Sequence, residues 1–149
     1  AYILDGGPCA RGIESTIVAF TGETPLLLRA GALETAEIEA VLGHTLARPG
    51  DASGITAPGQ LKSHYAPRAT LRLDAATPMS GEGYLGFGDH CPLEGNLSPT
   101  GNLTEAAANL FAMLRAFDLR YERIAVAPIP RTGLGEAIND RLARAAHRD

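Results

Sequence analysis

The stretch LTEAAANLFAMLRAFDLRYERIAVAPI, residues 103–129, decides the fold because it joins a helix to a buried strand. Over residues 103–117, apolar side chains recur in alternating steps of four and three, which is the spacing of one helix face. Asn102, with Glu105 three positions later, predicts a capping box at the start of this helix. Residues 124–129 then form an apolar run, closed by prolines, that predicts a buried strand. The predicted helix face consists of Leu103, Ala107, Leu110, Leu114 and Phe117.

Short strands are expected before this stretch. Residues 71–73 alternate between apolar and polar, and residues 84–87 form a second apolar run. Residues 96–98 are a third candidate strand. Together with the helix and strand that follow, this order predicts a small Rossmann-like α/β domain with a partly parallel sheet over residues 70–149.

A last helix is expected after Gly133-Leu134-Gly135. Its predicted inward positions are Ile138, Leu142 and Ala145, which follow helical spacing. The cationic residues Arg141, Arg144 and His147 lie toward the C-terminal end, where positive charge interacts favourably with the helix dipole.

The first 47 residues are predicted to form three short strands and one helix. Ile3-Leu4 is the first strand, and residues 15–20 and 26–28 form a hairpin around a polar loop. Residues 34–42 form the helix, with Ile38, Val41 and Leu42 on one face and Gly43 as the stop. These elements are too few to close a core alone, so we expect the tail of a larger α+β domain. The predicted fold class of the whole chain is α/β.

Composition and charge exclude several classes of protein. The 149 residues are 45% apolar and carry a formal net charge of −4, which argues against broad nucleic-acid binding. No run of about 18 apolar residues predicts a membrane span, and no signal segment opens the chain. Cys9 and Cys91 are too few for a secreted disulfide framework, so the cytoplasm is the expected location.

Three residues of the first region are candidates for a phosphate-binding site. Ser15 and Thr16 follow glycine-rich turns, and hydroxyls beside such backbone can bind phosphate oxygens. Arg29 ends the next strand, and its planar fork of N–H donors matches phosphate or carboxylate. If the two strands pair, all three side chains meet. The alternatives are hydroxyls that simply begin a strand and an arginine that is merely solvated.

The connector over residues 48–69 carries the motif Ser63-His64-Tyr65-Ala66-Pro67. Loops of this length without secondary structure are usually functional or disordered. His64 and Tyr65 can hydrogen-bond a ligand or move a proton, so we expect a strap over a site. The alternative is a linker histidine beside an aromatic ring packed for rigidity. Neither a metal site nor a catalytic triad is predicted anywhere in the chain.

Five motifs together resemble the two-domain form of the threonylcarbamoyl-AMP synthase family. Their order and spacing carry the resemblance, which extends over essentially the whole chain. Two positions differ from the common pattern of that family, which often has aspartate where Ala19 stands and proline where Ala30 stands. The motifs are Asp5–Cys9, Gly12–Val18, Leu27–Ala32, Ala57–Gly59 and Ser63–Pro67.

The resemblance implies an enzyme that forms threonylcarbamoyl-AMP from threonine, bicarbonate and ATP, with Mg²⁺ held mainly by ATP. A downstream transferase would then modify tRNA with the threonylcarbamoyl group. Residues 1–47 would be the C-terminal part of the catalytic domain, 48–69 the linker and 70–149 an accessory domain. Ser15, Thr16 and Arg29 would bind nucleotide or substrate, and His64 and Tyr65 would form a gate.

The family's lysine–arginine pair and its serine–alanine–asparagine motif have no counterpart here, so we expect this chain to be inactive alone. Two other interpretations stay open. The chain could be a non-catalytic module that binds a ligand or a partner protein, or a stand-alone nucleotide-binding protein.

Overall fold

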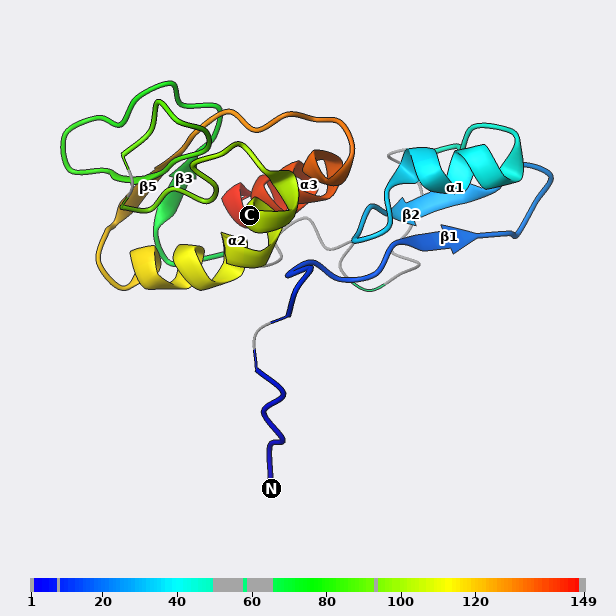
Figure 1. Cartoon of the computed structure of the whole chain (residues 1–149), viewed down its shortest axis with the longest axis horizontal. Helices are drawn as coiled ribbons and strands as arrows, with labels where there is room; N and C mark the ends of the chain where they lie inside the picture. The colour runs from blue at the N-terminus through cyan, green and yellow to red at the C-terminus, as the bar shows by residue number, and fades with distance from the viewer. Residues whose placement is uncertain (1, 8, 50–57, 59–65, 93, 148–149) are drawn as a thin grey trace.

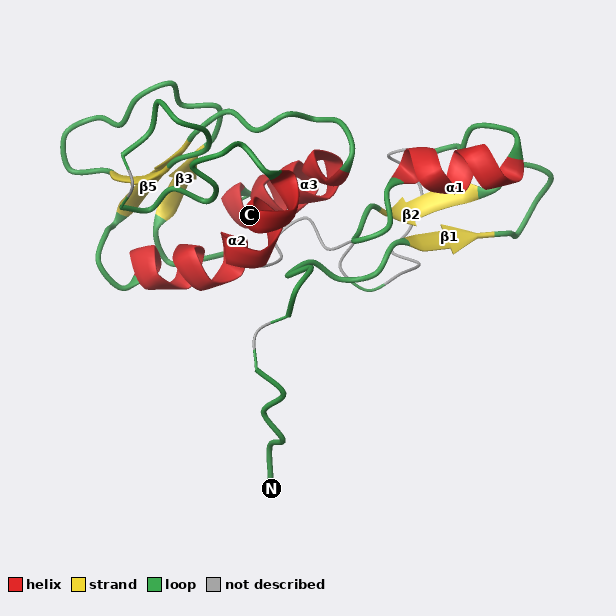
Figure 2. Cartoon of the chain, viewed as in Figure 1, coloured by secondary structure: helices red, strands yellow, loops and turns green. Residues whose placement is uncertain are grey.

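The computed structural model describes residues 2–7, 9–49, 58, 66–92 and 94–147. Two lobes lie side by side, one formed by the earlier elements and one by the later elements (Figure 1). Both lobes combine helices and strands, so the protein has the predicted mixed α/β fold (Figure 2). The first lobe contains β1 (Ile17–Ala19), β2 (Leu26–Arg29) and α1 (Thr35–Leu42). The second contains β3 (Thr70–Arg72), β4 (Gly83–Leu85), α2 (Leu103–Asp118), β5 (Arg123–Val126) and α3 (Leu134–Ala146).

The sheet of the second lobe has the strand order β3-β5-β4, and both of its strand pairs are parallel. Ile124, Ala125 and Val126 of the central strand are almost fully buried, as expected for a parallel strand covered on both faces. The strand predicted at residues 96–98 is reduced to one isolated bridge between Gly86 and Asn96.

Both helices of this lobe pack against the sheet and against each other, α2 beside β4 and α3 beside β3. Asn102 caps α2, and its side-chain oxygen accepts from the N–H groups of Thr104 and Glu105 at 2.9 and 3.0 Å. Glu105 does not complete the predicted capping box. Its carboxylate instead accepts from the hydroxyl of Ser98 at 2.5 Å. Across the described ranges, no helix is long and apolar enough to cross a membrane.

The first lobe contains the predicted hairpin, in which β1 and β2 pair antiparallel and Ile17 lies opposite Arg29. Helix α1 ends at Gly43, whose φ of 74° is the left-handed conformation that glycine adopts easily. One expectation for this helix is wrong. Val41 is 87% exposed, because the covered face contains Ile38 and Leu42 and does not extend to Val41.

The strand predicted at Ile3-Leu4 is not formed. Residues 2–7 contain no strand, and the side chains of Tyr2, Ile3 and Leu4 are more than nine-tenths exposed. This segment runs away from both lobes (Figure 1). A strand needs a neighbour to satisfy its backbone hydrogen bonds, and no strand of the described chain pairs with this segment.

The two lobes meet along α2 and α3. Gly12 lies so close to α2 that a β-carbon there would come within 2.3 Å of the carbonyl oxygen of Ala107. At the start of α3, the carboxylate of Glu136 accepts from the hydroxyl of Thr35 at 2.7 Å and pairs with Arg48. The first lobe is therefore fastened to both helices of the second.

Candidate functional site

The hairpin brings Arg29 to Ser15. The Nε and Nη2 atoms of Arg29 donate to the carbonyl oxygen of Ser15 at 3.2 and 2.9 Å, and Nη2 lies 3.4 Å from the Ser15 hydroxyl. This follows from the antiparallel register, which places the end of β2 beside the residues that precede β1. A guanidinium and a hydroxyl thus lie together at a partly exposed position, where an anion can reach both.

The segments 14–16 and 29–32 pack tightly, and we call them the Ser15–Arg29 wall. The N–H of Ala32 donates to the carbonyl oxygen of Glu14 at 2.9 Å. A β-carbon at Gly31 would approach that oxygen to 2.3 Å and the nitrogen of Thr16 to 2.4 Å. Only glycine allows this separation, so a shift of one segment moves the other.

Thr16 does not join Ser15 and Arg29. Its hydroxyl donates to the carbonyl oxygen of Leu33 at 2.5 Å. Of the three side chains predicted to meet, the structure therefore brings two together. The third fixes the backbone of the same wall.

The linker is described at Pro58 and again from Ala66 onward. The carbonyl oxygen of Pro58 accepts from Nη1 of Arg29 at 3.1 Å, so the linker passes beside the wall. Ala66 and Pro67 line a small cavity of about 230 Å³ against Phe111 and Arg115 of α2. His64 and Tyr65 lie outside the described residues, and their predicted role stays a prediction.

Arg141 also lies in a different environment from the one predicted. The sequence predicts that it interacts with the helix dipole at the C-terminal end of α3. Its side chain is instead only 1% exposed and faces the first lobe. Its Nε donates to the Glu14 carboxylate at 2.9 Å, and its Nη2 donates to the carbonyl oxygen of Ala30 at 3.0 Å. Its Nη1 donates to Asp140 at 2.5 Å. Position 141 lies three residues after Ile138, which was predicted to face inward. Helical spacing therefore indicated that Arg141 faces inward too.

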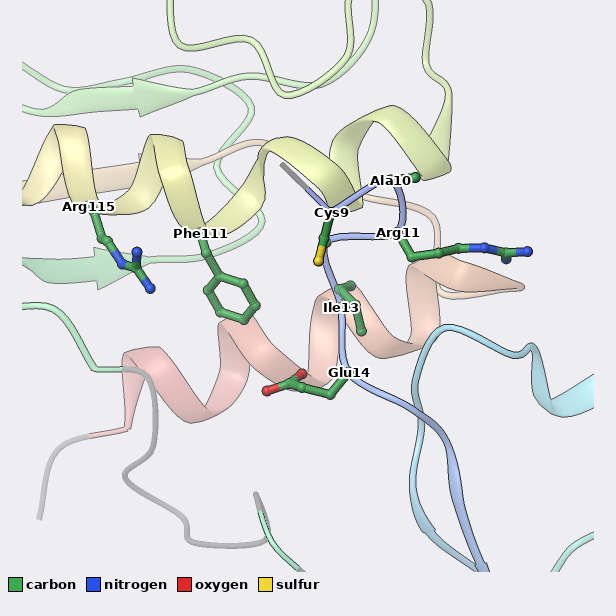
Figure 3. A pocket seen from close by; sticks show the side chains of 8 residues that line it. Cys9, Ala10, Arg11, Ile13, Glu14, Phe111 and Arg115 are labelled. Atoms are coloured by element: carbon green, nitrogen blue, oxygen red, sulfur yellow. The ribbon is translucent and has the colours of Figure 1, made fainter. Parts of the chain in front are cut away.

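A larger cavity of about 530 Å³ lies between residues 9–14 and α2. Phe111 points into it from α2, toward Ile13 and Glu14 on the opposite segment (Figure 3). Arg115 lines its other end. Both apolar side chains and the charged groups of Arg11, Glu14 and Arg115 therefore line the cavity.

Two side chains of the second lobe, Glu82 and Tyr84, have strongly shifted pKa values. The Arg72 guanidinium, hydrogen-bonded to Glu82, lowers the pKa of that carboxyl to about 2. Burial, together with the neighbouring Cys91 thiol, raises the pKa of Tyr84 to about 12. Within the described part of the chain, no group of three or more His, Cys, Asp or Glu residues could hold a metal ion.

Comparison with protein families gives a match over most of the chain. The family described as "Threonylcarbamoyl-AMP synthase, C-terminal domain" matches residues 33–147. The threonylcarbamoyl-AMP synthase of Bacillus subtilis (strain 168) is 32% identical over 171 residues, covering 98% of this chain and 49% of the relative. The enzyme of the same name from Pyrococcus abyssi (strain GE5 / Orsay) is 32% identical over 167 residues, covering 97% of this chain and 48% of the relative. The chain thus spans about half the length of these relatives.

Solved structures agree with the sequence match. P. abyssi Sua5 complexed with L-threonine superposes with a TM-score of 0.78 at 30% identity, over 95% of this chain and 48% of that one. A P. abyssi Sua5 variant, in which a histidine and the tyrosine after it are replaced by alanine, gives 0.73 at 28% identity. It covers 95% of this chain and 47% of that one.

Proposed function

This chain belongs to the threonylcarbamoyl-AMP synthase family, and from that premise we propose that it supplies the phosphate-facing wall and the accessory domain of such an enzyme. The observation that carries the proposal is the Arg29 guanidinium, held against Ser15 with the hydroxyl at its side. Four hydrogen bonds to described residues engage the fork, and arginine has five N–H donors, so one N–H of Nη1 remains for a ligand.

The proposed reaction makes use of this geometry. The amine of threonine attacks the carbon of bicarbonate, and the N–C bond forms as a C–O bond breaks and water leaves. An oxygen of the resulting carbamate then attacks the α-phosphate of ATP, forming a P–O bond and displacing pyrophosphate. Arg29 offsets negative charge on the phosphates, and Ser15 offers a hydroxyl donor. Mg²⁺ is proposed to enter with ATP, because magnesium in nucleotide sites is commonly bound through the substrate phosphates. The Thr16 backbone, fixed by Leu33, completes the wall.

The proposed substrates are L-threonine, bicarbonate and ATP. The threonine is supported by the similar structure of P. abyssi Sua5, which is a complex with that amino acid. The product is proposed to pass to a transferase that modifies tRNA in the cytoplasm. The chain itself carries a net charge of −4, which does not favour direct binding to tRNA phosphates.

We propose that His64 and Tyr65 close over the wall and exclude water from the labile adenylate. Contacts on both sides of this segment support the proposal, since Pro58 meets Arg29 and Pro67 lies by α2. The variant structure of the relative replaces the same two residue types, in the same order. The proposed division is catalytic for residues 1–47, linker for 48–69 and accessory for 70–149.

Pyrophosphate release by the complete gene product tests the proposal. Release should require threonine, bicarbonate and ATP together, and mass spectrometry should detect threonylcarbamoyl-AMP. The 149-residue chain alone should give neither product. Complete protein that binds ATP but yields no adenylate under any of these conditions would point instead to a non-catalytic binding module.

A further inference from the structure

We propose that Arg141 is a positioning residue, through which the second lobe holds the Ser15–Arg29 wall in its ligand-binding geometry. The inference rests on the proposed function, because it assigns a consequence for ATP. Arg141 contacts Glu14 and Ala30, and these are the immediate neighbours of Ser15 and Arg29 in the sequence. One guanidinium of the accessory domain therefore grips both segments of the wall at once.

The grip needs an arginine. Nε reaches the Glu14 carboxylate while Nη2 reaches the Ala30 carbonyl, and the planar fork fixes the distance between these two acceptors. A lysine has a single ammonium on a flexible stem and cannot set that distance. Asp140, which accepts from Nη1, fixes the third side of the fork.

The burial of Arg141 indicates that the contact is specific. A charge that is only 1% exposed must be paired and hydrogen-bonded, and here two carboxylates and one carbonyl meet that need. Glu14 is 36% exposed, so it could be hydrated without Arg141, whereas Arg141 has no comparable access to water. Loss of the contact would therefore cost the buried Arg141 side chain of α3 more than it would cost Glu14. In this way α3 constrains the position of the wall.

A movement of the wall also moves the Arg29 guanidinium. Because Gly31 lies in direct contact with the backbone of residues 14–16, a shift at Glu14 or Ala30 displaces both segments. Arg29 binds the Ser15 carbonyl through two donors, so the guanidinium follows that shift. Misplacement of a binding group by about 1 Å can cost about a hundredfold in rate, which makes a small shift measurable.

The experiment compares Arg141→Met with Arg144→Met in the complete gene product. Arg144 is the matched control, because it lies one turn further along α3 and its guanidinium donates to the same Asp140. Calorimetric titration with ATP and steady-state kinetics are measured well below the unfolding temperature of each protein. We expect Arg141→Met to raise the Kd and KM for ATP about tenfold or more. Arg144→Met should stay within about twofold of wild type.

A second variant keeps the test decisive if Arg141→Met does not fold. Glu14→Ala removes the carboxylate end of the same contact and should raise the Kd for ATP similarly. The double variant should be no worse than the worse single variant, because both changes break one contact. Folded Arg141→Met or Glu14→Ala protein with wild-type ATP affinity, or strictly additive effects, would overturn the inference. Wild-type protein without threonine-dependent pyrophosphate release would instead overturn the proposed function.

Discussion

Arg141 on the last helix donates its Nε–H to the carboxylate of Glu14, 2.9 Å away and 127 positions earlier in the chain. The same side chain bonds the carbonyl of Ala30, the residue after Arg29. The second lobe is therefore in direct contact with the candidate site. The position of α3 in the second lobe is therefore linked to the geometry of Glu14 and Ala30 in the first lobe.

Replacement of Arg29 by alanine should weaken ATP binding by the complete gene product. The loss should be about 1–3 kcal/mol, the usual cost of removing a charged hydrogen bond. Isothermal titration with ATP measures it. Arg120→Ala is the control, since Arg120 is exposed and pairs only with Glu94 among the carboxylates of the described residues. Equal affinities for the two variants would favour the binding-module interpretation.

Replacement of Gly31 by alanine should destabilise the protein by about 1–3 kcal/mol, the typical cost of overpacking. The added β-carbon would lie 2.3 Å from the Glu14 carbonyl oxygen, and backbone atoms cannot move aside cheaply. Urea unfolding followed by circular dichroism measures the change in the free energy of unfolding. Gly22→Ala serves as the control, because a β-carbon at Gly22 would have no atom within 4 Å apart from those of its two chain neighbours. Its effect should stay within about 0.5 kcal/mol.

Acid should destabilise the second lobe through Glu82. Arg72 lowers the pKa of this carboxyl from 4.5 to about 2, so the folded state holds the proton less tightly than the unfolded state. The contribution of this pair to stability is therefore complete above pH 4.5 and is lost as the pH falls toward 2. Glu82→Gln should flatten the dependence of the unfolding midpoint on pH in this window. Glu94→Gln is the matched control, because it removes one carboxylate from an exposed ion pair of the same lobe.

Tyr84 should resist ionisation up to strongly alkaline pH. Its hydroxyl donates to the carbonyls of Ala75 and Ala76, and burial raises its pKa from 10 to about 12. The folded state thus holds this proton more tightly, so stability is complete below pH 10 and declines as the pH rises toward 12. Ultraviolet absorbance of tyrosinate should show one of the four tyrosines titrating last. Tyr84→Phe should remove that final step; a late step that persists would assign it to another tyrosine.

Local pattern predicted much of this fold. The four-three spacing over residues 103–117 and the apolar run from Ile124 became α2 and β5, because burial of one face or of both faces sets those patterns. The hairpin was predictable from its polar loop, and its register then placed Arg29 beside Ser15. Both the helix–strand stretch and the hairpin could be predicted from residues that lie close together in the sequence.

Other features depend on distant parts of the chain. The apolar residues Ile3 and Leu4 have strand character but no strand partner in the described structure, and a strand forms only with one. Arg141 looked like a residue suited to the dipole, because nothing near it in sequence indicates that Glu14 and Ala30 lie opposite. The partner of the Thr16 hydroxyl is likewise distant, because the carbonyl oxygen of Leu33 lies 17 positions later in the chain.

The hydrogen bond between Arg29 and the Pro58 carbonyl anchors the linker at one point beside the wall. A second anchor lies further along the chain, where Ala66 and Pro67 line a cavity with Phe111 and Arg115 of α2. A chain extends by at most about 3.6 Å per residue, so the eight steps from Pro58 to Ala66 span at most about 29 Å. Deletion of two residues between these anchors would shorten that reach by about 7 Å, so the length of the linker, and not only its composition, matters for keeping both contacts.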